Sequence, residues 1–375
     1  MVGVAESPVA AGVDIEGGTT EALLGPTAAP GLADRTRLPR LSRHTITLPD
    51  GHQVGVAVCG EGVPFVLVHG FSAEGFLYAQ TLWRLVDMGF KVVAIDMAGH
   101  GGTQGLPTGG ADFAAYTDLL RRVLDSLGIR RCVIAGHSMG GRLVTQLAAV
   151  DPDRVLAVLL VDAIVGKTWD RIVWISRVWP PMLAGVALGL VADTLSTVPL
   201  FRDPDQARKL GRLIGPTIVG HVRRPWRLLG PAASILRSQG SGWMLDLIRH
   251  HKIPLFAVHG DRDIVVPVAT GRDAARRANG VLVVVEGATH SWLLKDPEAM
   301  PGIVHDLMRK ELGTAVLRSK MKAGMEGDEP RTEVDASEWF YDPDSLAVAL
   351  TPHQEWHDDE QLHRAPRYRW RIERD

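Results

Sequence analysis

Apolar and polar residues alternate over residues 43–59, on both sides of a Pro-Asp-Gly turn at 49–51. Such alternation predicts two antiparallel strands joined as a hairpin. From residue 63 onward the pattern changes to continuous apolar runs, which are typical of strands buried on both faces of a sheet. These runs cover residues 63–70, 91–96, 131–138, 154–163, 253–260 and 281–287.

Segments in which apolar residues have helical spacing separate these runs. They cover about 76–89, 111–127, 139–150, 268–279 and 297–312. Strands and helices that alternate in this way form a parallel sheet with helices on both faces. The predicted fold class is therefore α/β, a mostly parallel sheet flanked by helices, built from residues 41–163 and 251–315.

The alternation stops over residues 164–250, where helical segments with Pro and Gly breaks predict an inserted helical lid. Half of the ten tryptophans of the chain lie in this stretch: Trp169, Trp174, Trp179, Trp226 and Trp243. These side chains either pack the lid onto the sheet or line an apolar substrate cavity beneath it, and both roles are compatible.

The two ends of the chain differ from the rest. Residues 1–40 are rich in Gly, Ala, Pro and Thr without a period, which predicts a mobile leader. Residues 316–375 form an acidic tail that nevertheless carries several aromatic residues. Since a fully solvated tail rarely keeps so many aromatics, we expect part of it to dock on the main domain or on a partner.

The overall composition narrows the function classes. The 375 residues are 46% hydrophobic and 22% charged, with a net charge of −2, so no strong field attracts nucleic acid. Two cysteines, Cys59 and Cys132, exclude a disulfide-stapled scaffold and a four-cysteine zinc site. This cysteine usage fits a reducing cytoplasm, where we expect the protein to reside.

Neither a targeting signal nor a membrane span is predicted. The N-terminus lacks a basic start and a sustained apolar block. The longest uncharged apolar run, 178–192, has 15 residues, and a bilayer span needs roughly 18–20. A buried helix and a lid surface that touches lipid both account for this run, so peripheral membrane contact through the lid stays open.

The segment Gly136-His137-Ser138-Met139-Gly140 matches the G-x-S-x-G pattern, after a predicted buried strand and before a predicted helix. In that context the glycines permit a tight strand-to-helix turn that exposes the serine hydroxyl. The turn also places Ser138 at a helix N-terminus, which favours developing negative charge. We therefore expect Ser138 to be a nucleophile.

A serine hydroxyl needs a base, and the base needs an acid that fixes its tautomer. His290 follows the last predicted strand and is the candidate base, and Asp263 follows the strand before it and is the candidate acid. Asp261 is a near rival for this role and Asp162 a more distant one. All of these residues follow the carboxyl ends of buried strands, where open parallel sheets place their sites.

The backbone N–H groups of Phe71 and Met139 are the expected oxyanion donors, because both follow strand ends that face the same space. The remaining pocket candidates are His69, His137, Trp174, Trp179 and Trp292. For His69 we expect hydrogen bonding that orders the loop rather than a role as a base. This chemistry needs neither a cofactor nor a metal, and we expect none.

The segments HGFS (69–72), DMAGHGGT (96–103), GHSMGG (136–141), GDRDIVVP (260–267) and GATH (287–290) together resemble the α/β-hydrolase superfamily. The resemblance covers about 43–312, and is greatest to the lid-bearing branch of esterases, monoacylglycerol lipases, thioesterases, C–C bond hydrolases and cofactor-free haloperoxidases. It implies the triad Ser138, Asp263 and His290. Relatives that open epoxides or remove halides carry a carboxylate at the nucleophile position, so Ser138 argues against both activities.

The sequence thus favours a serine hydrolase that cleaves carboxylic esters with an apolar acyl or alcohol group through an acyl-enzyme on Ser138. A thioesterase or a C–C bond hydrolase would use the same triad, and a catalytically idle binding protein would keep the fold alone. We expect a small-molecule ester or acyl substrate and no nucleic-acid partner. The natural substrate and the oligomeric state stay open.

Overall fold

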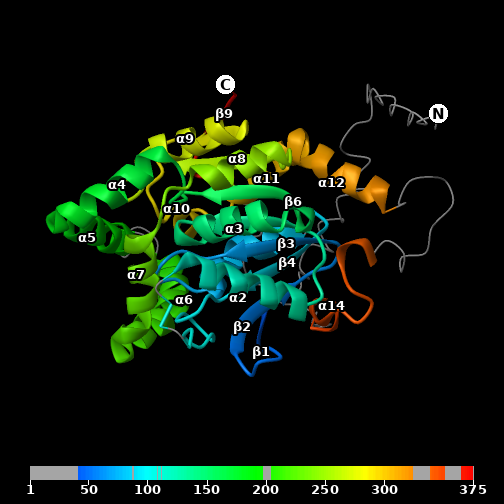
Figure 1. Cartoon of the computed structure of the whole chain (residues 1–375), viewed down its shortest axis with the longest axis horizontal. Coiled ribbons are helices and arrows are strands. Elements are labelled where there is room, and N and C mark those ends of the chain that lie inside the picture. The colour runs from blue at the N-terminus through cyan, green and yellow to red at the C-terminus, as the bar shows by residue number, and fades with distance from the viewer. Residues whose placement is uncertain are drawn as a thin grey trace, which may run out of the picture.

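A computed structural model describes residues 41–196 (apart from 87, 108 and 111), 204–323, 338–350 and 365–374. Its centre is a nine-stranded sheet with the order β1-β2-β4-β3-β5-β6-β7-β8-β9 (Figure 1). The six strands β3 to β8 are parallel to one another, whereas β1, β2 and β9 run antiparallel to their neighbours. The predicted fold class, a mostly parallel sheet flanked by helices, is confirmed.

Each apolar run of the sequence forms a strand. The alternating segment gives the hairpin β1 (Ser42–Thr47) and β2 (Gln53–Cys59). The continuous runs give β3 (Val63–Val68), β4 (Phe90–Ile95), β5 (Cys132–His137), β6 (Val155–Val161), β7 (Leu255–Gly260) and β8 (Val281–Val285). Nearly every residue of these six strands is buried, as expected when helices cover both faces of a sheet.

Two groups of helices cover the sheet. On one face α2 (Phe113–Ser126), α3 (Met139–Val150), α8 (Gly242–His250) and α9 (Val268–Ala278) pack side by side. On the other face α1 (Ala79–Val86) packs against α11 (Ala299–Met308), which in turn contacts α12 (Glu311–Lys322). The short helices η2 (Gly75–Tyr78), η3 (Pro152–Arg154) and α10 (Trp292–Lys295) lie in the connections.

The segment between β6 and β7 is helical, as predicted. It contains α4 (Lys167–Val178), α5 (Pro180–Ser196), α6 (Pro204–Arg223), η4 (Pro225–Leu228) and α7 (Leu229–Arg237), which extend beyond one end of the sheet (Figure 1). We call α4 to α7 with η4 the inserted helices. The last helix of the predicted lid, α8, packs on α3 and α9 and so belongs to the sheet domain. No helix of the described chain is long and apolar enough to cross a membrane.

The C-terminal residues continue the sheet domain. The expected boundary between the sheet domain and the C-terminal tail, at residues 315/316, is wrong, because it falls inside α12. β9 (Trp370–Glu373) extends the sheet beside β8. Residues 338–350, which include α14 (Leu346–Ala349), pack at the amino ends of the parallel strands, where the Tyr341 hydroxyl donates to Gly62 O at 2.7 Å. The predicted leader 1–40 and tail residues 324–337 and 351–364 lie outside the described part.

We expect Trp370→Ala to lower the free energy of unfolding by about 2–3 kcal/mol, because Trp370 secures β9. Its indole N–H donates to Asp306 at 2.9 Å, and its ring lies against Gly302. Urea unfolding measures the change. The control Arg374→Ala removes only an exposed ion pair with Glu311 and should change it by less than about 0.5 kcal/mol. Equal effects of the two substitutions would contradict the anchoring role of Trp370.

Candidate active site

Ser138 lies on a sharp turn between β5 and α3 and has a backbone conformation that residues other than glycine rarely adopt. Its φ and ψ are 51° and −116°. Such strain costs of order 1–3 kcal/mol and persists only where the surroundings enforce it. Here the Ser138 N–H donates to Val161 O at 2.9 Å, and the Ser138 carbonyl accepts from Gly141 N and Ile164 N. The turn is therefore held from β6 and from the first turn of α3.

The glycines on either side of Ser138 are required by close backbone contacts. A Cβ atom on Gly136 would lie 2.5 Å from the carbonyl of Gly140. A Cβ atom on Gly140 would lie 2.2 Å from Val68 O. Since neither contact can relax without moving backbone, β3, β5 and α3 can converge at this point only with glycine at both positions.

His290 and Asp263 form a buried hydrogen-bonded pair at the carboxyl ends of β8 and β7. His290 Nδ1 lies 2.7 Å from Asp263 Oδ2. The other oxygen of Asp263 accepts from the backbone N–H groups of Val265 and Val266, each at 2.8 Å. An ionised carboxylate can only accept, so His290 carries its proton on Nδ1 and leaves Nε2 as a base.

The electrostatics of this pair favour an ion pair once His290 gains a second proton. Burial alone would lower the pKa of His290, but the charge of Asp263 and the hydrogen bond to it outweigh burial and raise that pKa above 6.5. Burial likewise opposes ionisation of Asp263, yet His290 and the hydrogen bonds hold the pKa of Asp263 below its usual value. Asp263 is thus placed to stabilise an imidazolium.

The two rival carboxylates make other contacts. Asp261 is exposed and accepts from Gly287 N at 2.7 Å, within the turn after β8. Asp162 is fully buried behind the pair and accepts from Gly260 N at 2.8 Å and from the Trp292 indole at 2.6 Å. Through Trp292, two residues beyond His290, Asp162 anchors the loop that carries the imidazole.

His69 orders the loop that follows β3. Its Nδ1 atom donates to Gly70 O at 2.7 Å, and its Nε2 atom accepts from Met97 N at 2.9 Å. Burial lowers the pKa of His69, so the ring stays neutral and keeps this tautomer. The loop presents Gly70 and Phe71 to the cavity described below.

Ser72, the next residue of this loop, is held at both of its backbone groups. Its N–H donates to His100 Nε2 at 3.2 Å, and its carbonyl accepts from His221 Nε2 at 3.1 Å. His221 belongs to α6, so the inserted helices hold one side of the loop while the 96–103 segment holds the other. The N–H of Met139, the first residue of α3, lacks an intrahelical acceptor. These features fix the backbone around the two expected oxyanion donors.

A cavity of about 700 Å³ lies between the sheet edge and the inserted helices and is lined by both Ser138 and His290. None of its lining residues is Asp, Glu, Lys or Arg. The aliphatic side chains that form its walls come from α4, α5, α6 and α7: Ile172, Val173, Val186, Leu190, Ile214, Ile235 and Leu236. Exposed lining residues on α5 and α6, Val191, Ile218 and Val222, place its opening towards solvent.

Among the predicted pocket residues, only His137 lines this cavity. Trp174 and Trp179 are 61% and 62% exposed and point away from it, because the buried face of α4 consists of Trp169, Val173 and Ser176. The prediction for these two tryptophans was therefore wrong. His69 and Trp292 lie behind the cavity wall rather than in it, since their hydrogen bonds hold them within the loops.

Two residues that sequence reasoning missed support the candidate base. The Tyr78 hydroxyl lies 2.9 Å from His137 Nδ1, and His137 Nε2 donates to His290 O at 3.1 Å. Asp193 on α5 accepts from Ser291 N at 2.7 Å. Asp193 could have been found from the sequence, because it is a single carboxylate directly after the apolar run 178–192. No sequence pattern indicated Tyr78, which lies on the short helix η2.

The described residues include one group with metal-ligand atoms close together, Asp162, His259 and Asp263. These atoms already have protein partners. His259 Nε2 donates to Val266 O at 2.7 Å, and both carboxylates accept the hydrogen bonds given above. A cation would have to displace these bonds, so the donor set suits a hydrogen-bonded support better than a metal site.

The sheet order, the strained serine turn and the inserted helices define the class as the α/β-hydrolases. The chain belongs to the family described as serine aminopeptidase, S33, whose model matches residues 64–298. It is thus a hydrolase of this fold, as the motifs predicted.

Relatives and solved structures agree with this placement. The chain is 33% identical over 270 residues to a protein of Mycobacterium phage D29, named provisionally as a non-heme haloperoxidase, covering 70% of this chain and 94% of that protein. A Mycobacterium bovis protein is 30% identical over 298 residues, covering 73% and 84%. Two solved structures share the fold. One is a carboxylesterase from Nitrososphaera gargenis, at 20% identity and a TM-score of 0.55, covering 73% of this chain and 100% of that chain. The other is the esterase RhEst1 from a Rhodococcus species, at 23% identity and a TM-score of 0.55, covering 72% of this chain and 98% of that chain.

We expect the pKa of the His290 imidazole to lie above 6.5 and to fall when Asp263 is replaced by Asn. The neutral amide cannot stabilise the charged ring, while burial still disfavours it. An NMR titration of histidine-labelled protein, with the signal assigned through His290→Gln, measures this. Asp261→Asn is the control and should leave the pKa of His290 in place. An unchanged pKa in Asp263→Asn would contradict the coupling of the pair.

Proposed function

We propose that the protein is a serine hydrolase of carboxylic esters. Ser138 is the nucleophile, His290 the general base and acid, and Asp263 the residue that orients and stabilises the imidazolium. The observation that carries the proposal is the 2.7 Å contact between His290 Nδ1 and Asp263 Oδ2, next to a cavity that His290 shares with Ser138. Geometry of this kind turns a weak hydroxyl into a nucleophile.

In the first half of the reaction, Ser138 Oγ attacks the ester carbonyl carbon while His290 Nε2 takes the hydroxyl proton. The backbone N–H groups of Phe71 and Met139 stabilise the oxyanion of the tetrahedral intermediate. The carbon–oxygen bond to the alcohol then breaks, and His290 returns the proton to the departing alcohol. The product is an ester between Ser138 and the acyl group.

In the second half, a water molecule attacks the acyl carbon and His290 takes one of its protons. The tetrahedral intermediate collapses, Ser138 regains its proton from His290, and the carboxylic acid leaves. His290 must be unprotonated on Nε2 for each attack, so its raised pKa places the acid limb of the pH–rate profile above pH 6.5.

The cavity suggests the kind of substrate. Its walls are aliphatic, and no charged side chain is available within it to bind a carboxylate or an ammonium group. A volume of about 700 Å³ lies within the range of roughly 300–1,000 Å³ typical of small-ligand sites. We therefore propose an uncharged ester with a medium or long acyl chain, or with a bulky apolar alcohol.

We expect wild-type protein to react covalently with a fluorophosphonate probe and Ser138→Ala not to react. The variant should also lose ester hydrolysis by about 10³-fold or more, because the remaining groups cannot form the acyl-enzyme. Mass spectrometry locates the adduct, and Ser126→Ala, a substitution in α2 outside the cavity, is a control that retains labelling. Absence of labelling in the wild type would instead indicate a binding protein with an idle site.

We expect kcat/KM for p-nitrophenyl octanoate to exceed that for the acetate by about tenfold or more, since each buried methylene contributes up to about 0.8 kcal/mol. Leu190→Asp places a charge in the cavity and should reduce turnover of the octanoate far more than that of the acetate. Leu188→Asp, on the exposed side of the same helix, is the matched control. A preference of the wild type for acetate would contradict the proposed substrate class.

A further inference from the structure

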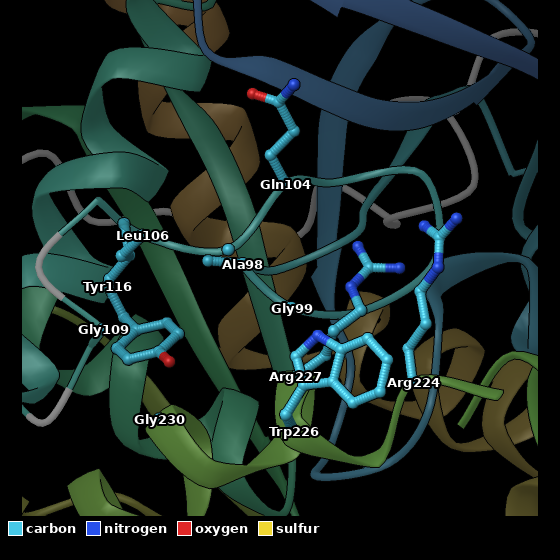
Figure 2. Close-up of a pocket in the computed structure, with 11 residues that line it drawn as sticks. Ala98, Gly99, Gln104, Leu106, Gly109, Tyr116, Arg224, Trp226, Arg227 and Gly230 are labelled. Atoms are coloured by element: carbon cyan, nitrogen blue, oxygen red, sulfur yellow. The ribbon is translucent and has the colours of Figure 1, made fainter. Parts of the chain in front are cut away.

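A second pocket, of about 490 Å³, lies between the inserted helices and the loops that follow β4 (Figure 2). Arg224, Trp226 and Arg227 form one side of it. The loop residues Ala98, Gly99 and Leu106 and the ring of Tyr116 form the other side. None of these residues lines the cavity that holds Ser138, so this is a separate site.

One short segment separates the two pockets. Within residues 221–230, His221, Val222 and Leu228 line the apolar cavity, whereas Arg224, Trp226 and Arg227 line the second pocket. Two arginines and the tryptophan of this segment thus face the second pocket, whereas His221 and two aliphatic residues face the cavity of Ser138. These arginines therefore lie outside the cavity proposed for the ester.

The two guanidinium groups lack a carboxylate partner within the described residues. Neither Arg224 nor Arg227 forms an ion pair there, and Arg227 donates only to the carbonyl of Thr103. The carboxylate that acts on Arg227 is Asp96, whose two oxygens already accept from Gly75 N and Gly102 N. Burial and the neighbouring charge of Arg224 lower the pKa of Arg227. An anion between the two groups would relieve this repulsion.

The pocket has fixed walls. The Arg227 side chain donates a hydrogen bond to the carbonyl of Thr103 and so connects η4 to the loop after β4. The backbone at Gly99 lies so close to η4 that a Cβ atom on Gly99 would be 2.5 Å from Arg227 O. The Trp226 indole is 62% exposed and, like the Tyr116 ring, borders the pocket (Figure 2). The space next to the two cations therefore also offers aromatic and aliphatic surface for an organic group.

We propose that this second pocket binds a phosphate monoester. Two guanidinium groups that form no ion pair among the described residues match the charge of a phosphate dianion, and their planar forks donate to its oxygens. A single carboxylate would neutralise only one of them. The organic part of the ligand lies against Trp226, Leu106 and Tyr116. The ligand is either a free organic phosphate or the headgroup of a phosphatidate in a bilayer.

Binding of glycerol 3-phosphate, measured by calorimetry at low salt with the full-length protein, tests the first source. We expect Arg224→Gln and Arg227→Gln each to weaken binding by about tenfold or more, because each loses charge-assisted hydrogen bonds. Arg223→Gln removes the same charge from the adjacent residue, which is exposed and outside the pocket, and should change the affinity less than about twofold. Thermal unfolding verifies that Arg224→Gln stays folded, as expected because the Arg224 side chain forms no hydrogen bond with the described residues.

Co-sedimentation with phosphatidylcholine vesicles, with and without phosphatidate, tests the second source. The site is supported if one of the two probes binds to the wild type and to Arg223→Gln but not to Arg224→Gln. The probe that binds, glycerol 3-phosphate or the phosphatidate vesicle, identifies the source of the phosphate monoester. The proposal is overturned if neither probe binds, if the three variants lose binding equally, or if acetate competes as well as phosphate. The readout is binding alone, so a failure here is distinguishable from a failure of ester hydrolysis.

Discussion

A serine held at a φ of 51° between β5 and α3 is the constraint on which the rest of the site depends. The chain adopts this conformation because β3, β5 and α3 converge so closely that Gly136 and Gly140 leave no room for a Cβ atom. The strain, of order 1–3 kcal/mol, is offset by the burial of β5 and α3 around it. In return the serine side chain faces the cavity at the N-terminus of a helix.

The other groups of the site come from distant parts of the chain, and the inserted helices connect to them at two points. Asp193 of α5 accepts from Ser291 N, next to His290, and His221 of α6 donates to Ser72 O in the loop of Phe71. The helices that form the cavity walls are thus bonded to both sides of the proposed active site. In the proposed function the same elements would set the size of the substrate and the geometry of catalysis.

Sequence patterns predicted the parallel strands because each is a continuous apolar run, and they placed Ser138, Asp263 and His290 at strand ends. They missed β9, because four residues of which two are charged carry no strand pattern, and because β9 pairs only with a strand that is distant in sequence. They misplaced Trp174 and Trp179, because the number of tryptophans in a segment does not indicate which face of the helix turns towards the cavity. Trp292 had no pattern that would reveal its bond to Asp162.

A crystal structure of the protein after reaction with an alkyl phosphonate would test the central claim most directly. We expect phosphorus bonded to Ser138 Oγ, the phosphoryl oxygen within hydrogen-bonding distance of the Phe71 and Met139 amides, and the alkyl chain in the apolar cavity. His290 Nε2 should face Ser138 while its Nδ1 remains on Asp263. An adduct on another residue, or His290 turned away from the adduct, would contradict the account.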